Sequence, residues 1–211
     1  MRKHLKVLVF LCCLLMAVSM VQPVEAKKFD SKAAKKKITV TYKKVPNGVL
    51  AIYKNKNKFA VKLSGTMRFR DSSNKAISTE KLANECLGPK STAALLYLAP
   101  VNEVGDVINY ANYKGSFSVS KTSNKSYAKK ISIQSEIGAL SGNFAAVNMS
   151  GKNLDYIHVT TVFYDGNQNI TYCQTKNINC HEKMSIDQFT VDYIGIVNKP
   201  QTVKVYVDWA Y

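Results

Sequence analysis

Acidic residues are almost missing from the first part of the chain. Between Lys27 and Lys62, twelve lysines accompany a single acid, Asp30. The excess of basic charge lies in the first half, because residues 27–125 hold 20 basic and 6 acidic side chains whereas residues 126–211 hold 7 of each. Two interpretations follow: the lysines attract a polyanion, or they only keep the chain soluble and protect exposed strand edges.

Patterns that carry catalysis or metal binding are also scarce. His158 and His181 have no serine, cysteine or carboxylate nearby at a catalytic spacing, and we expect His158 to face solvent. No Cys/His spacing indicates zinc, and the scattered acids, Asp208 among them, are expected in turns and at edges rather than in a calcium loop. No glycine-rich phosphate loop, dinucleotide fingerprint or nucleic-acid motif occurs. We therefore expect neither an enzyme nor a cofactor, a metal or a specific nucleic acid.

Residues 1–26 have the pattern of a signal peptide. A basic start is followed by an apolar run from Val7 to Met20 and by Val24-Glu25-Ala26, a small-residue cleavage site. A membrane anchor would need about 20 apolar residues, and Gln22-Pro23 interrupts this run too early. We expect a mature chain that begins near Lys27 and is secreted or extracellular, with or without retention at the cell envelope.

Three cysteines remain after such cleavage: Cys86, Cys173 and Cys180, an odd number for a compartment in which disulfides form. An extended segment would hold Cys173 and Cys180 more than about 20 Å apart, so a bridge between them needs an intervening turn. Thr175-Lys176-Asn177 is the candidate turn. The sequence leaves open both this disulfide and three free thiols.

An internal repeat is the clearest pattern in the chain. Lys36-Lys37-Ile38-Thr39-Val40 recurs as Lys129-Lys130-Ile131-Ser132-Ile133, at an offset of 93 residues. In each copy a turn then leads to a second apolar segment, through Pro46-Asn47-Gly48 or Ser141-Gly142-Asn143. A longer alternating run that ends in Phe-x-Asp follows in both copies. Period-two alternation of this kind predicts half-buried strands.

The later segments correspond in the same order. They are alternating runs at Val61–Asp71 and Asp155–Asp165, return strands at Ile77 and Ile170, apolar strands at Ala93–Leu98 and Ile186–Val191, and closing strands at Ser116–Val119 and Val203–Trp209. An offset of this length suits small β-sandwich domains. We predict an all-β chain of two tandem immunoglobulin-like antiparallel β-sandwich domains at 36–121 and 129–211, after a basic arm at 27–35 and joined by a linker at 122–128.

Two local predictions concern single segments. Alternation along the closing strand places Trp209 on the same face as Val203, Val205 and Val207, and therefore in the core. Ser78–Leu87 is the segment that we expect to form a helical turn or two.

The second copy resembles a known family. Val147-Asn148-Met149-Ser150-Gly151-Lys152 and Val162-Phe163-Tyr164-Asp165-Gly166-Asn167 look like the bend and hairpin of the FxLYD-type domains of bacterial secreted proteins. The first copy departs from the pattern, with Arg70 in place of the tyrosine and Asn55-Lys56-Asn57-Lys58 at the bend. The resemblance implies an immunoglobulin-like sandwich and a surface location, but no activity. The residues themselves indicate that Asp165 bonds the backbone of its own turn.

Two hypotheses about function remain. In the first, the protein is a non-catalytic binding module whose basic first domain engages an anionic cell-surface polymer or membrane, and whose second domain is left for a protein partner. The candidate anion-binding residues are Lys35, Lys36, Lys37, Lys54, Lys56 and Lys58. In the second, the chain is a structural or accessory extracellular protein without a ligand of its own.

Overall fold

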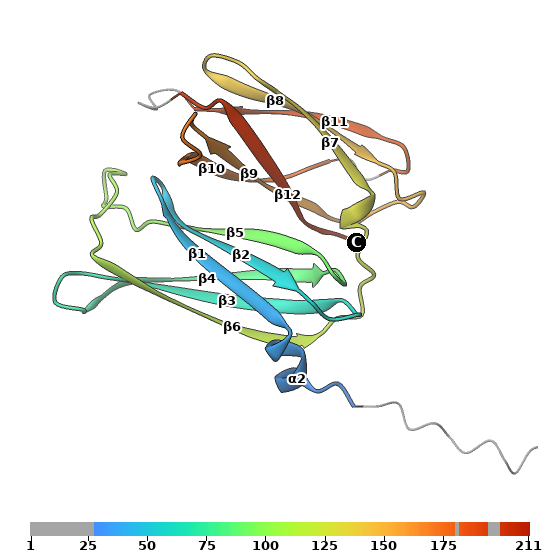
Figure 1. Cartoon of the computed structure of the whole chain (residues 1–211), viewed down its shortest axis with the longest axis horizontal. Helices are drawn as coiled ribbons and strands as arrows, with labels where there is room; N and C mark the ends of the chain where they lie inside the picture. The colour runs from blue at the N-terminus through green and yellow to red at the C-terminus, as the bar shows by residue number, and fades with distance from the viewer. Residues whose placement is uncertain (1–27, 180–181, 194–198) are drawn as a thin grey trace, which may run out of the picture.

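The computed structural model describes residues 28–179, 182–193 and 199–211, which form a stack of β-sheet layers (Figure 1). The expected signal peptide, Cys180 and His181 lie outside these residues. The first half contains α2 (Ser31–Lys36), β1 (Ile38–Val45), β2 (Gly48–Asn55), β3 (Val61–Arg70), β4 (Ala76–Leu87), β5 (Thr92–Leu98) and β6 (Asn112–Lys121). The second half contains the 3-10 turn η1 (Ala128–Lys130), β7 (Ile131–Ile137), β8 (Ser141–Asn148), β9 (Ile157–Tyr164), β10 (Ile170–Asn177), β11 (Ile186–Asp192) and β12 (Thr202–Ala210).

Both halves use one sheet topology. The described strands pair into antiparallel sheets with the orders β4-β3-β6, β1-β2-β5, β10-β9-β12 and β11-β8-β7, which is also their order through the stack in Figure 1. Each strand of the second half therefore occupies the place of the strand six positions earlier, with β9 between β10 and β12 as β3 lies between β4 and β6. This arrangement confirms the predicted fold of two tandem antiparallel β-sandwiches.

The bend after the second strand of each half is held by a buried asparagine. Asn55 donates to the Phe59 carbonyl at 3.0 Å and accepts from the Asn57 backbone N–H at 2.9 Å. Asn148 does the same with the carbonyl of Lys152 and the N–H of Ser150, both at 3.0 Å. Because a buried carbonyl or N–H without a partner is costly, one amide side chain fixes each bend.

The hairpin after the third strand also repeats. The Asp165 carboxylate accepts from the N–H groups of Asn167 and Asn169, both at 2.9 Å, as the sequence predicts. Asp71 accepts from the Lys75 N–H at 2.9 Å and from the Ser73 hydroxyl at 2.7 Å. These bonds lower the pKa of both carboxyl groups, since they favour the ionised form.

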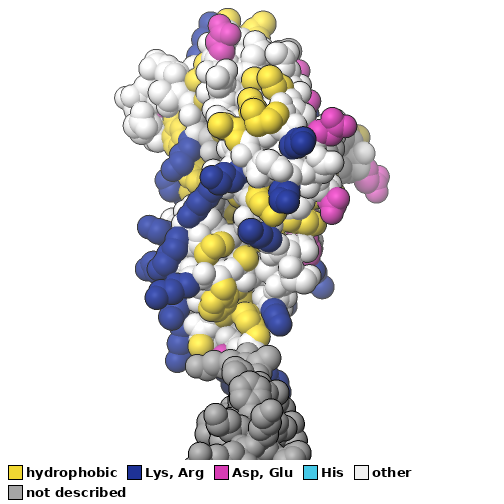
Figure 2. Space-filling view, turned by 90° about the vertical axis from the view of Figure 1, so that its right-hand side faces the viewer, with side chains coloured by type: hydrophobic (Ala, Val, Ile, Leu, Met, Phe, Trp, Pro, Cys, Tyr) yellow, Lys and Arg dark blue, Asp and Glu magenta, His cyan; other side chains and the backbone are white. Residues whose placement is uncertain are grey.

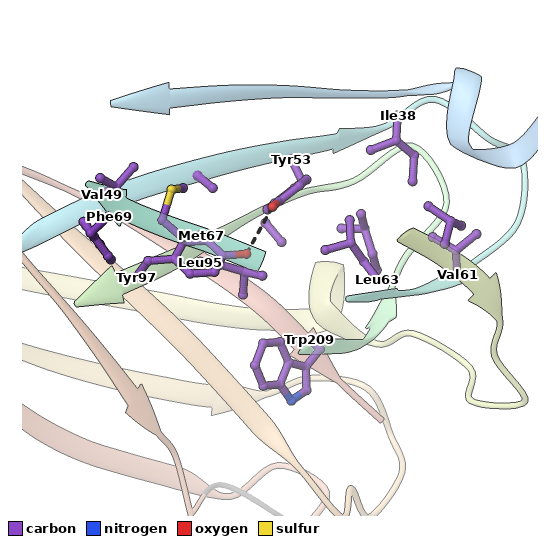
Figure 3. Packing of buried hydrophobic residues seen from close by; sticks show 14 of the residues in the cluster. Ile38, Val49, Tyr53, Val61, Leu63, Met67, Phe69, Leu95, Tyr97 and Trp209 are labelled. Atoms are coloured by element: carbon purple, nitrogen blue, oxygen red, sulfur yellow. Dashed lines mark hydrogen bonds between the residues drawn. The ribbon is translucent and has the colours of Figure 1, made fainter. Parts of the chain in front are cut away.

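The core of the first half lies between its two sheets (Figure 3). Tyr53 and Tyr97 are almost completely buried there, and their hydroxyl oxygens are 3.2 Å apart. Gly65 on the facing strand makes room for them, because a Cβ at that position would lie 1.8 Å from the Tyr97 oxygen. A separate core fills the second sandwich and includes Phe144, Phe163 and other residues of β8, β9 and β11.

The two sandwiches also pack on each other through the sheets β1-β2-β5 and β10-β9-β12. The outward faces of β2 and β5 supply Leu50 and Leu96, which cluster with Val162, Cys173 and Tyr206 of the second half. Strand β5 is consequently buried on both faces from Ala93 to Tyr97. Burial on both faces explains why this segment reads as an uninterrupted apolar run instead of alternating.

A polar network crosses the same interface. The fully buried Asp208 carboxylate accepts from the Ala94 N–H at 2.6 Å and from the Thr160 hydroxyl at 2.6 Å, and its Oδ2 lies 2.9 Å from His158 Nδ1. Asn84 donates to the Asp208 carbonyl at 2.7 Å. Complete burial raises the pKa of Asp208, and the bonds from His158 and Thr160 oppose that rise.

The network corrects three predictions from the sequence. Asp208 lies on the edge strand β12 but is almost completely buried, and the His158 side chain is only 15% exposed, because both face the other sandwich. A bulge between Val207 and Trp209 breaks the alternation of β12. Trp209 is buried as predicted, but it joins the core of the first half (Figure 3), where its ring also stacks on His158 with 4.1 Å between centroids.

Three further expectations were wrong in detail. Ser78–Leu87 is not helical, because the segment lies in β4 and pairs along β3. Ser141-Gly142-Asn143 is the start of β8 rather than a turn; the turn precedes it and is closed by the Gly138 N–H and the Ser141 carbonyl at 2.8 Å. The basic arm expected at 27–35 is structured from Ser31, where α2 begins.

Candidate anion-binding surface

Helix α2 positions the first group of candidate lysines. Asp30 caps it by accepting from the Ala33 N–H at 2.9 Å, and Ala34 is 2% exposed within the core of the first half. A helix of one and a half turns is unstable alone, so this docking is what maintains it. Lys35, Lys36 and Lys37 are left exposed, and Lys35 Nζ lies 4.8 Å from the centroid of the Phe117 ring on β6.

The bend after β2 positions the second group. Lys54, Lys56 and Lys58 alternate there with the buried Asn55 and Asn57, so the three lysine side chains point outward and are exposed. The Lys56 N–H donates to the Lys37 carbonyl at 2.8 Å. The structure therefore brings the two groups of candidate lysines together.

Asn57 links the bend to the helix. Its side-chain amide donates to the Ala34 carbonyl at 3.0 Å and to Asn55 Oδ1 at 2.9 Å. One buried asparagine pair thus fixes both the bend that carries Lys56 and the end of the helix that carries Lys36.

Several exposed lysines outside the six candidates lie on neighbouring strands. Lys43 and Lys44 of β1 and Lys114 and Lys121 of β6 are exposed on two edge strands, which α2 spans. Lys44 Nζ lies 4.5 Å above the Tyr110 ring. The sequence alone does not show that β1 and β6 are edge strands of the two facing sheets, because that requires the sheet order.

Two more lysines approach the bend from other segments. The Lys90 N–H donates to the Asn57 carbonyl at 3.2 Å, and Lys129 Nζ donates to the Pro89 carbonyl at 3.1 Å. Figure 2 shows the result on the surface: lysine and arginine side chains form a column along the left-hand side of the molecule, whereas most of the acidic side chains visible in that view lie at the top and along the right-hand side. We use the name basic surface for the exposed lysines of α2, β1, β6 and the bend with its flanking residues. They are Lys32, Lys35, Lys36, Lys37, Lys43, Lys44, Lys54, Lys56, Lys58, Lys114 and Lys121.

Few acids neutralise these lysines. Lys62 Nζ lies 2.6 Å from Glu85 Oε2, and this is the one lysine or arginine ion pair with an acid among the described residues. Asp30, the nearest acid in sequence to α2, accepts the capping bond instead. The basic surface therefore presents an accumulated positive potential to solvent.

The structure decides between the two alternatives for Cys173. Cys173 is a free thiol, fully buried between the two sandwiches, and Cys86 is also free. The candidate turn Thr175-Lys176-Asn177 continues β10 instead of turning. Burial raises the pKa of Cys173 to about 12 and that of Cys86 to about 11, so neither is a reactive thiolate near neutral pH.

The described residues contain neither a metal-binding cluster nor a helix that could span a membrane. Within residues 28–179, 182–193 and 199–211, no three histidine, cysteine or acidic side chains are grouped closely enough to hold a metal ion. The same residues include no helix with the length and apolar character to cross a membrane.

Comparisons with known proteins assign the chain to no family. No family model matches the chain, and no curated protein matches it. Among solved structures, red sea bream transglutaminase aligns with a TM-score of 0.29 and 10% sequence identity. That alignment covers 87% of this chain and 31% of the transglutaminase, so the chain spans less than a third of the length of that protein. A similarity of this size assigns no function.

Proposed function

We propose that the protein is a non-catalytic extracellular binding module whose basic surface holds a linear anionic polymer of the cell surface. The observation that carries this proposal is the accumulation of exposed, unpaired lysines from α2, β1, β6 and the bend along one side of the molecule (Figure 2). A column suits a linear polyanion better than a flat membrane, because successive charges of a polymer can follow it. The second half, with 7 basic and 7 acidic residues, is left for a protein partner.

Binding of this kind has a clear physical signature. Contacts between lysines and a polyanion release counterions, so the affinity falls steeply as salt increases. Exposed charges are screened within about 8 Å at physiological ionic strength. Each lysine–anion contact is therefore weak, and the affinity is the sum of many such contacts.

The test is a salt titration of binding to inorganic polyphosphate and to poly-glutamate. The surface variant replaces Lys35, Lys36, Lys37, Lys54, Lys56 and Lys58 by glutamine. The matched control replaces six exposed lysines elsewhere, Lys75, Lys81, Lys152, Lys176, Lys183 and Lys199, and so has the same net charge. We expect the surface variant to lose roughly tenfold or more in affinity at low salt, with a flatter salt dependence, and the control to lose much less.

Equal losses in the two variants would show that net charge alone acts. The lysines would then serve solubility, and the accessory-protein hypothesis would replace this one. If the protein binds anionic lipid vesicles saturably but binds neither polymer, the ligand of the basic surface is an anionic membrane and not a linear polymer.

A further inference from the structure

One end of the basic surface is hollowed into a pocket of about 380 Å³. It lies where the segment that leads into α2 meets the bend after β2 and the end of β6. Its walls include Phe29, Ala33 and Phe59, and Lys28, Lys37 and Lys121 stand around it. Pockets of this size accommodate a small ligand or part of a larger one.

The walls are apolar and rigid. Phe29 and Phe59 meet edge to face, with 6.0 Å between ring centroids. Phe29 also packs against the core of the first half, and the Asn55 amide holds the Phe59 carbonyl at 3.0 Å. Phe59 nevertheless remains 47% exposed, so a large aromatic surface is held open to solvent inside the pocket.

Positive charge predominates around the pocket, which three lysines and one acid line. The only acid among its lining residues is Asp30, and one of its carboxylate oxygens already accepts the capping bond from Ala33. Lys28, Lys37 and Lys121 are exposed and form no ion pair with an acid among the described residues. Three lysines thus line a pocket that has an aromatic wall.

We infer that this pocket binds an amphiphilic anion, a single alkyl chain that carries a phosphate or carboxylate headgroup. The chain would cover Phe29 and Phe59, because burying exposed aromatic surface is favourable. The headgroup would lie among the three amines, for which charge complementarity selects an anion. A plain polyanion would leave the aromatic wall uncovered, and a neutral alkyl compound would leave the amines unused. The inference is independent of polymer binding: Lys37 is common to both, whereas Phe29, Phe59, Lys28 and Lys121 distinguish the pocket from the six lysines tested above.

Octyl phosphate is the probe, measured as monomers by titration calorimetry with the mature chain. Inorganic phosphate and octyl glucoside serve as the headgroup-only and chain-only comparators. We expect saturable binding of one octyl phosphate per chain, and at least roughly tenfold weaker binding of either comparator.

Four variants locate the site. Phe59→Ser is expected to weaken octyl phosphate binding by roughly tenfold, and Phe59→Leu, which keeps an apolar wall, by much less. Lys121→Gln should weaken it several-fold and flatten its salt dependence. Tyr156→Ser changes a comparably exposed aromatic of the second half and is the matched control. Thermal unfolding of each variant confirms that it is folded.

The inference is overturned if Phe59→Ser and Lys121→Gln bind octyl phosphate as the wild type does, or if either comparator binds as tightly as octyl phosphate. Polyphosphate binding separates the two proposals, since Phe59→Ser should leave it unchanged. If Phe59→Ser loses octyl phosphate binding but keeps polyphosphate binding, the pocket inference is supported. If the wild type binds polyphosphate but no octyl phosphate, the pocket inference is refuted and the proposal of polymer binding stands.

Discussion

In both halves of the chain an asparagine holds the bend after the second strand, but the residue two positions later makes different contacts in the two halves. Asn55 and Asn148 make equivalent bonds to the carbonyl four residues on and the N–H two residues on. In the first half, Asn57 then reaches out to the Ala34 carbonyl. In the second half, the Ser150 hydroxyl turns back to Asn148 and Lys152.

This difference explains why only one half carries the basic surface and the pocket. The outward bond from Asn57 holds α2 against the sandwich, which places Lys36 and Lys37 beside the bend. The inward bonds of Ser150 complete the bend, and the segment before β7 is the three-residue turn η1, which the Met149 N–H contacts through the Lys130 carbonyl at 2.8 Å. A shared β framework therefore supports different surfaces through single side chains at its bends.

The interface between the halves should be the most sensitive place in the molecule. Leu96→Asp introduces a carboxylate among Val162, Tyr206 and the other apolar side chains of the interface cluster. We expect a loss of about 4 kcal/mol in the free energy of unfolding, because an unpaired charge is buried there. Denaturant unfolding followed by circular dichroism measures it, together with the fluorescence of Trp209, the single tryptophan, which lies at the junction.

Leu98→Asp on the same strand is the matched control. Leu98 is 57% exposed, so this variant should lie within about 0.5 kcal/mol of the wild type. If Leu96→Asp is no more destabilising than Leu98→Asp, the two sandwiches are not docked through this cluster.

The matched asparagines should have the next largest effect. Asn55→Ala removes bonds to the carbonyls of Phe59, Leu87 and Gly88, and Asn148→Ala removes those to Lys152 and Glu182. We expect each variant to lose about 3 kcal/mol in the free energy of unfolding, because buried carbonyls lose their donors. Asn109→Ala, at an exposed position, should change little.

Only Asn55→Ala should also weaken polyphosphate binding, since it alone loosens the bend of the basic surface. If Asn148→Ala weakens that binding equally, the loss comes from general destabilisation and the comparison between the halves fails.

The sequence was sufficient for the sandwiches because strands such as β3 are buried on one face only. Strand β3 alternates between buried and more exposed residues along its length, and the pattern from Val61 to Asp71 shows this directly. The Asp165 turn was predictable for a related reason, since it depends on bonds within five consecutive residues. Local geometry and period-two alternation are both properties of a short segment.

The interface and the basic surface depend on contacts that no segment reveals. Ala93–Leu98 reads as an apolar strand, but its burial on a second sandwich requires knowledge of which sheets meet. Asp208 looks like a surface acid, but the face of β12 that it shares with Tyr206 packs on the first sandwich, where Asp208 accepts from the N–H of Ala94, 114 residues earlier. Helix α2 was missed because six residues are too few to form a stable helix alone, although Ala and Lys favour helix, and this one depends on the burial of Ala34.

The smallest effects on stability should come from substitutions of Asp71 and Asp165. These residues hold equivalent hairpin turns, at which the two halves are most alike. Both carboxyl groups are exposed and have a pKa below the usual value, Asp71 mainly through Ser73 and Asp165 mainly through the Asn169 N–H. A lowered pKa in the folded state contributes stability above the unfolded pKa of about 3.9, and that contribution is lost as the pH falls through the folded value.

Asp71→Ala and Asp165→Ala should therefore each lower the melting temperature slightly at pH 7, by similar amounts, and the difference from wild type should shrink below about pH 4. Asp71→Asn and Asp165→Asn can still accept the turn bonds, so they should retain part of the stability without its pH dependence. A large effect at one turn and none at the other would show that the two hairpins, despite matching bonds, are not equivalent in the folded chain.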